Sequence, residues 1–280
     1  LMYGSGIFAP LVAPYGYNDQ DLTKVKQGPS FSNPLGTDRL GRDMLTRVIY
    51  SLRTTVIITV ISLVTGSLLL GITLGLLAGY FGRWLDGIIM RVGEVTASFP
   101  DIFLVLIIVA TVKPRILTWV HTFEDSTGID WIVRLGIVDY LVISLALAAF
   151  SWFGMARLVR GQVLQVRENQ YVEASRAIGS STLRILAIHV LPNVISPVIV
   201  SISAGLAGIA TAEIVLSWLG IGIQPPTPSL GVMIFENGNL SVLRSDPHLT
   251  LVPSGVLVVL LFTFNLLGDG INDAFNPRAR

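Results

Sequence analysis

Long apolar stretches alternate with polar segments along this chain, on the length scale of membrane-spanning helices. The longest runs from about Thr54 to Tyr80 and contains no Asp, Glu, Lys, Arg or His. A helix rises about 1.5 Å per residue, so about 20 apolar residues cross the roughly 30 Å hydrocarbon core of a bilayer. The same pattern predicts further spans over about 87–111, 140–156, 193–219 and 249–268.

Composition agrees with a membrane protein that is all-α and polytopic. The 280 residues are 52% hydrophobic and 13% charged, and the mean hydropathy is +0.69. These values are too apolar for an ordinary soluble domain. A formal net charge of +1 gives no reason to expect a nucleic-acid partner. Since the chain has no cysteine, disulfides, thiolate metal sites and a cysteine nucleophile are excluded.

The polar and apolar stretches divide the chain into three parts. We expect residues 1–14 to be the outer end of a first helix whose beginning is missing, because this apolar run is short and interrupted by glycine and proline. Residues 15–53 are polar, with mixed charge and turn-forming Gly-Pro and Asn-Pro pairs, and form a segment outside the cytoplasm. Residues 54–280 form the membrane domain, which contains a polar loop at 157–192.

Glycine spacing predicts one close helix contact within that domain. Gly71, Gly75 and Gly79 recur every four residues, which leaves a strip of one helix without side chains. Such small-xxx-small repeats let a second helix approach the backbone closely.

Four ionisable residues fall inside the predicted spans, where a charge is costly unless it pairs or meets water. Arg91 and Glu94 are three residues apart and could pair on one helix face. They and Asp101 could instead line a translocation path. Glu213 lies near the far end of its span, where it could bond to a neighbouring helix or act in an outer mouth or gate.

The polar stretch at 171–193 has the pattern of two short helices joined by a turn. Tyr171, Ala174, Ser175 and Ile178 predict a weakly apolar face, with Glu173 and Arg176 pointing away from it. Ser180 or Ser181 can cap the second helix.

An apolar stripe in that second helix is predicted at Leu183, Leu186, Ala187 and Val190. Gly179 lets the backbone turn between the two helices without a side-chain clash. This arrangement favours a docking surface for a soluble partner, and an amphipathic helix on the membrane surface is the alternative.

This stretch resembles the EAA loop of the membrane subunits of bacterial ATP-binding-cassette importers. That loop has Glu-Ala-Ala, three residues, Gly, nine residues and Ile-x-Leu-Pro. The chain matches it at Glu173, Ala174, Gly179, Leu191 and Pro192, and departs from it at Ser175 and His189.

Three further stretches are similar to the C-type permeases of the dipeptide, oligopeptide and nickel branch of these importers. They are PLGTDRLGRDMLTRVIYSLRTT, AEIVLSWLGIGIQPPTPSLGVMI and NLLGDGINDAFNPRAR. For the first stretch, an interfacial amphipathic helix anchored by Arg42, Arg47 and Arg53 is a compatible alternative. The resemblance implies a MetI-like permease fold with a six-helix core, of which the first helix is largely missing here.

The resemblance also implies the partners and the mechanism. These are a B-type permease forming a heterodimer, two ATPase subunits that hold ATP and Mg²⁺, and an extracytoplasmic substrate-binding protein. Movement would pass through the coupling residues Glu173, Ala174, Ser175, Arg176 and Gly179. Peptides are the expected substrates, and nickel chelates, glutathione or another small solute are the alternatives.

Charge indicates the orientation in the membrane. Residues 155–185 contain five arginines against two acidic residues, which favours the cytoplasm for this loop. The implied location is the bacterial cytoplasmic (inner) membrane.

The sequence contains no motif that would let this chain act as an enzyme. It has no GxxxxGK[ST] phosphate-binding loop, no GxSxG nucleophile elbow and no histidine spacing typical of a metal site. We therefore expect no catalytic residue, metal or cofactor on the chain itself. A channel or secondary transporter that needs no ATPase, and a membrane-embedded enzyme using Arg91, Glu94 and Asp101, remain as alternatives of other classes.

Overall fold

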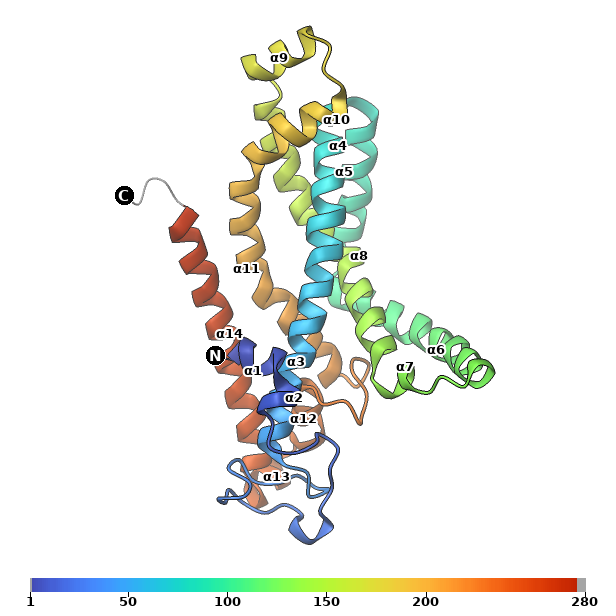
Figure 1. Cartoon of the computed structure of the whole chain (residues 1–280), viewed down its shortest axis with the longest axis vertical. Coiled ribbons are helices and arrows are strands. Elements are labelled where there is room, and N and C mark those ends of the chain that lie inside the picture. Colours follow the sequence, from blue (N-terminus) through green and yellow to red (C-terminus); the bar gives the residue numbers. More distant parts are fainter. Residues whose placement is uncertain (1, 276–280) are drawn as a thin grey trace. The chain divides into compact units, whose positions relative to one another are not determined.

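A computed structural model describes residues 2–275, which form α-helices joined by turns (Figure 1). Five helical stretches are long and apolar enough to cross a membrane: Met44–Phe81, Asp101–Thr127, Ile137–Val166, Thr182–Trp218 and His248–Ile271. The described residues contain no β-strand, only one isolated bridge between Thr37 and Asp43. The predicted all-α, polytopic class is confirmed.

The first long stretch begins earlier than predicted. It consists of α3 (Met44–Ser62), a π-helical segment (Leu63–Ile72) and α4 (Thr73–Phe81). Asp43 starts it, because its carboxylate accepts a hydrogen bond of 2.7 Å from the backbone N–H of Thr46. Arg47 and Arg53, which precede the predicted span, therefore belong to the helix.

The predicted span over 87–111 is wrong. It is divided between α5 (Arg83–Ala97) and α6 (Asp101–Thr127). Pro100 explains the break, since the residue before a proline is driven out of the helical region. Helix α6 continues through Lys113, beyond the end of the predicted span at residue 111. The short helix α7 (Trp131–Arg134) follows it, in a stretch between two predicted spans.

The other long helices lie close to the predicted spans. They are α8 (Ile137–Val166), α11 (Leu191–Trp218) and α14 (His248–Phe275). The short helices are α1 (Met2–Ile7), α2 (Ala9–Val12), α9 (Gln170–Ala177), α10 (Thr182–Arg184), α12 (Leu230–Asn237) and α13 (Leu240–Ser245). A second π-helical segment, Ile185–Val190, joins α10 to α11.

The chain forms two compact units, and each long helical stretch contributes residues to both. The first unit contains residues 1–61, 105–144 and 208–263, and the second contains 62–104, 145–207 and 264–280. One core cluster of the first unit joins Met44 and Val48 of α3 to Met233 and Leu249.

Close packing of α4 on α8 organises the second unit, in which α4 also lies beside α5 (Figure 1). A Cβ atom added at Gly71, Gly75 or Gly79 would lie 2.7 Å from an atom of α8, closer than real Cβ contacts. The predicted role of this glycine strip in helix packing is confirmed.

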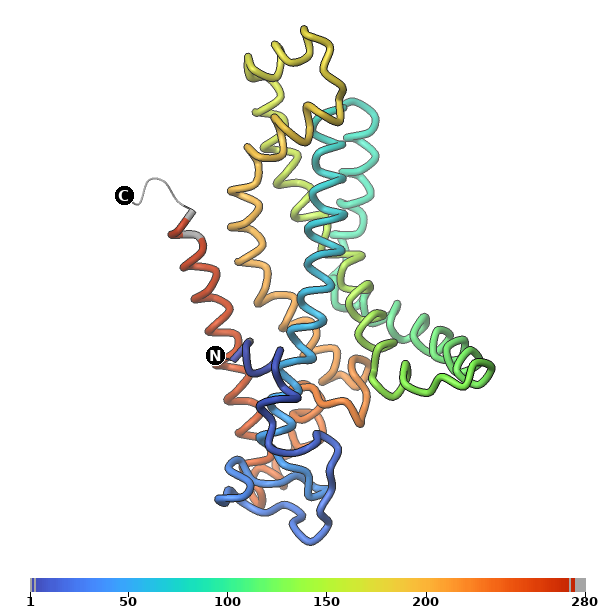
Figure 2. Tube along the Cα trace, in the orientation of Figure 1, coloured from blue at the N-terminus to red at the C-terminus, as the bar shows by residue number. Residues whose placement is uncertain are grey.

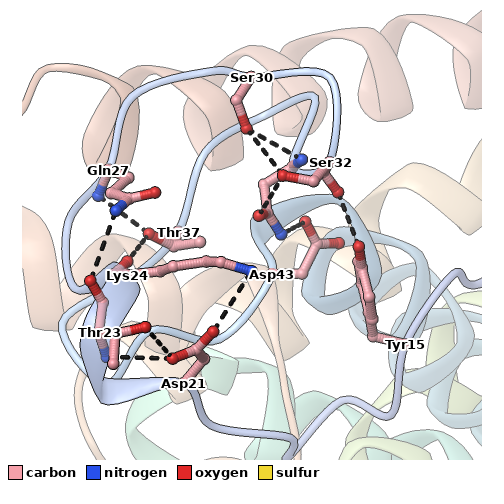
Figure 3. Close-up of polar contacts among 10 residues, drawn as sticks. Tyr15, Asp21, Thr23, Lys24, Gln27, Ser30, Ser32, Thr37 and Asp43 are labelled. Atoms are coloured by element: carbon pink, nitrogen blue, oxygen red, sulfur yellow. Dashed lines mark hydrogen bonds and ion pairs between the residues drawn. The ribbon is translucent and has the colours of Figure 1, made fainter.

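Residues 15–43 have little regular structure, and polar contacts hold them in place. Their trace in Figure 2 is an irregular loop with one short 3-10 turn, Leu22–Lys24. Figure 3 shows the contacts, which include Tyr15 to the Ser32 carbonyl at 2.9 Å and Gln27 N–H to Thr37 at 2.9 Å.

A buried ion cluster fastens this segment to α3. The Asp38 carboxylate accepts from Arg42 Nε at 2.7 Å and also pairs with Arg47, and all three side chains are buried. The alternative interpretation of this stretch predicted that Arg42 and Arg47 anchor a helix at the membrane interface. That prediction is wrong for these two residues, because their charges are neutralised inside the protein. Burial opposes ionisation of Asp38, but Arg47, backbone N–H donors and Arg42 lower the pKa of its carboxyl.

Candidate functional site

The polar loop after α8 folds as two short helices around a glycine turn, as predicted. Helix α9 ends at Ala177, and Gly179 has a φ of +81°, a conformation that favours glycine. Of the two predicted caps, Ser181 is the one used, because its hydroxyl accepts from the N–H of Arg184.

The buried face of α9 differs from the predicted one. Val172 and Ser175 are buried, and Val172 belongs to a core cluster with Val163 of α8. Of the predicted face, only Ser175 is buried, and Ala174 and Ile178 are exposed. A helix of eight residues rests on its neighbour through one i, i+3 pair, so the wider periodic pattern misassigned the face.

The apolar stripe predicted for the second helix is also partly wrong. Val190 is buried, but Leu183 and Ala187 are exposed and the unpredicted Ile185 is buried. The π-helical turn at Ile185–Val190 changes the residue spacing, so a regular 3.6-residue period does not describe this stretch.

Arginines attach the loop to the last turn of α4. The Arg167 guanidinium donates to the carbonyl of Gly79 at 2.8 Å, so it satisfies a helix C-terminus. Arg176, which was predicted to point away from the apolar face of the helix, is exposed but also contacts α4. Its guanidinium stacks on the Tyr80 ring at 5.0 Å and its Nε donates to the Tyr80 hydroxyl at 3.3 Å.

The outer surface of the loop presents apolar groups beside a carboxylate. Ile178 and Leu183 are 83% and 78% exposed, and Glu173 and Ala174 are exposed too. The Ser175 hydroxyl is buried without a hydrogen-bond partner in the described part of the chain. The loop therefore combines a firmly attached inner face with an uncovered apolar outer edge.

Arg91, Glu94 and Asp101 lie on exposed parts of α5 and α6. Arg91 pairs with Glu94 at 3.5 Å, with side chains 80% and 58% exposed. An exposed pair of this kind contributes about 0–1 kcal/mol. Asp101 is the first residue of α6, where the helix dipole favours a carboxylate.

Glu213 is fully buried in the first unit and accepts three hydrogen bonds from hydroxyls. Thr55 of α3 donates to one oxygen at 2.9 Å, and Ser217 and Ser229 donate to the other, each at 2.9 Å. This matches the interhelical hydrogen bond predicted for Glu213. The cluster also attaches the start of α12 to α3 and α11.

A buried ion pair that the sequence analysis missed holds the neighbouring loop. Lys113 of α6 lies 3.0 Å from Asp139 of α8 and donates to the Gly222 carbonyl at 2.8 Å. Asp139 accepts from the Gln224 N–H at 3.0 Å. A single lysine after an apolar run was the available signal, but its partner is distant in sequence.

A family model decides between the functional classes that the sequence analysis left open. Residues 71–280 match the model described as "Binding-protein-dependent transport system inner membrane component". The chain belongs to this family. It is thus a permease subunit of the inner membrane, a non-enzymatic component of a transporter whose ATPase is a separate subunit.

Similar permeases cover nearly the whole chain. The dipeptide transport system permease protein DppC of Alkalihalophilus pseudofirmus is 33% identical over 98% of this chain and 81% of that relative. The glutathione transport system permease protein GsiD of Pectobacterium atrosepticum is 35% identical over 100% and 84%. The oligopeptide transport system permease protein OppC of Mycobacterium tuberculosis is 35% identical over 100% and 88%.

A solved structure supports the fold of this permease. In the inward-facing MetNI methionine ABC transporter, one chain is similar with a TM-score of 0.56 and 18% identity, over 83% of this chain and 98% of that chain. At this identity the likeness concerns the fold alone. The predicted MetI-like permease fold is confirmed.

Proposed function

We propose that this permease is the C-type membrane subunit of an ATP-driven, binding-protein-dependent importer of peptides. It would form the translocation path with a B-type permease and receive substrate from an extracytoplasmic binding protein. Two ATPase subunits would bind ATP and Mg²⁺. Relatives in dipeptide, oligopeptide and glutathione systems support a peptide substrate, and the glutathione relative makes glutathione the second candidate.

The observation that carries the ATP-driven mechanism is the two-sided loop around α9. Val172 and Ser175 hold its inner face on the protein, while Ile178 and Leu183 leave apolar area uncovered on its outer edge. A soluble ATPase could bury that edge. Its movement would then be transmitted through Arg176 and Tyr80 to α4.

Within this loop we assign each predicted coupling residue a part. Exposed Glu173 would bond a basic group of the ATPase, and small Ala174 would allow close approach. Ser175 and Arg176 would attach α9 to the permease, and Gly179 would set the turn.

Glu213 would hold the start of α12 in place at the outer mouth or gate. Arg91, Glu94 and Asp101 would line the path only if the partner permease covers them.

Reconstitution tests the proposal. Proteoliposomes that contain the complete complex and its binding protein should accumulate a labelled dipeptide only when ATP is present, and liposomes containing this chain alone should not. ATP-independent uptake by the chain alone would identify a channel or secondary transporter instead. Unlabelled glutathione added as competitor would distinguish the two substrate candidates.

A further inference from the structure

A cavity of about 280 Å³ in the first unit has no role in the arguments above. It lies between the middle of α3, the N-terminal segment, the start of α8 and the loop before α12. Its lining residues are Tyr17, Tyr50, Arg53, Thr54, Ile57, Leu135, Ile137, Tyr140, Thr227 and Pro228.

The polar groups of this cavity are suited to bind an anion. Among the described residues that line it, Arg53 is the only charged one, and none is an aspartate or glutamate. Among the side chains that the structure describes, Arg53 has no ion-pair or hydrogen-bond partner, unlike buried Arg42 and Arg47. The hydroxyls of Tyr17 and Tyr50 likewise have no hydrogen-bond partner in the part of the chain that the structure describes and can donate.

The cavity wall is held in place before any ligand binds. The Thr54 hydroxyl donates to the Pro228 carbonyl at 2.9 Å, so at the 3.4 Å contact with Tyr140 the phenol is the donor. The rings of Tyr17 and Tyr50 pack with centroids 5.0 Å apart. These contacts join the separate segments into one site, which reduces the ordering cost of binding.

The remaining surface of the cavity is apolar, which argues against an inorganic anion. This apolar surface favours contact with a hydrocarbon or aromatic group. It is formed by the tyrosine rings and by Ile57, Leu135, Ile137 and Pro228. The volume lies just below the usual range of ligand pockets, about 300–1,000 Å³. It suits one residue of a larger ligand.

We propose that this cavity binds an organic carboxylate next to an apolar side chain, as at the C-terminal residue of a peptide, with Arg53 as its anion ligand. A guanidinium bonds a carboxylate through two parallel N–H donors, which a lysine or a neutral side chain cannot reproduce. The choice of a peptide rests on the proposed function. The positive, acid-free lining itself does not depend on it.

Binding of Gly-Phe to the purified transporter complex tests the site. Equilibrium dialysis without the binding protein should detect Gly-Phe bound to the complex. Gly-Phe amide should displace bound Gly-Phe at least about tenfold more weakly than Gly-Phe itself, because the amide lacks the carboxylate. Arg53→Gln should weaken Gly-Phe binding by about tenfold or more, and Arg53→Lys by less. Arg39→Gln, which removes an exposed charge outside the cavity, should change nothing.

A second variant protects the test if Arg53→Gln fails to assemble. Ile57→Trp should fill the cavity and abolish binding with Arg53 intact, whereas Ile107→Trp at an exposed α6 position should not. No binding to the unmodified complex, equal binding of peptide and amide, or unchanged binding in Arg53→Gln and Ile57→Trp would each overturn the proposal. Dialysis binding without ATP-driven uptake would instead refute the proposed function alone.

Discussion

At the scale of single residues, the buried polar groups of the first unit hold its irregular segments in place. Both carboxylate oxygens of Glu213 accept hydrogen bonds from hydroxyl groups. The ion pair of Lys113 and Asp139 holds the loop at 222–224, and the ion pair of Asp38 with Arg47 attaches residues 15–43 to α3. A buried group left without its partner costs more than the pair contributes. Removing one partner should therefore destabilise the unit strongly.

Asp38 provides a pH-dependent test at this scale. Its pKa is lowered in the folded protein, so its contribution to stability is complete above the unfolded value of about 3.9 and is lost as pH falls through the lower folded value. Asp38→Asn should lower the free energy of unfolding by about 3–5 kcal/mol at pH 7, because Arg42 loses its anion and Arg47 keeps only the more distant Glu236, at 3.9 Å. Thermal melts of the purified complex at pH 7, 5, 4 and 3 would measure this difference.

The control for Asp38 is Asp130→Asn, which removes a carboxylate that is 83% exposed. Its melting temperature should match that of the unmodified protein at each pH. A difference between Asp38→Asn and the unmodified protein that stays constant down to pH 3 would contradict the linkage argument.

At the scale of elements, the contact between α4 and α8 depends on the absence of side chains. A Cβ atom at Gly75 would lie 2.7 Å from both the Ala156 carbonyl and the Val159 Cβ, and the carbonyl belongs to the backbone and cannot rotate away. The two helices would have to separate to accept a larger residue.

Gly75→Leu should therefore lower the stability of the complex by about 1–3 kcal/mol, the usual cost of overpacking. Gly87→Leu is the matched control, since a Cβ there would meet nothing within 4 Å. Thermal melts of both variants in one detergent would compare them. Equal melting temperatures would mean that the helices pack less closely than described.

At the scale of the whole molecule, the proposed function requires that the α9 loop transmit movement without being needed for assembly. Gly179 adopts a φ of +81°, which a β-branched residue rarely tolerates. Gly179→Val should reduce ATP-driven dipeptide uptake at least tenfold, while the two permeases still co-purify. Glu173→Lys should have the same effect, because it reverses an exposed charge.

Gly154→Val is the control for Gly179→Val, because Gly154 has no positive φ and a Cβ there meets nothing within 4 Å. Uptake and co-purification should both be normal in it. Normal uptake by Gly179→Val and Glu173→Lys would refute the coupling role, and loss of co-purification would show that the loop serves assembly instead.

Local patterns predicted the features that depend on near neighbours in sequence. Apolar length predicted four of the five long membrane helices, four-residue glycine spacing predicted a close helix contact, and Gly179 predicted the turn. The prediction was wrong where a long-range partner altered a local preference. Lys113 continues α6 because Asp139, distant in sequence, neutralises its charge inside the protein.

The sequence by itself determined the class of this protein, because a bilayer requires long apolar helices whatever surrounds them. The tertiary structure alone decided which polar side chains are buried, which face of α9 is attached and which three tyrosines line a cavity with Arg53. The physical reason is that charge pairing and burial depend on distances between residues far apart in the chain, such as Tyr17 and Tyr140, and no local period encodes those distances.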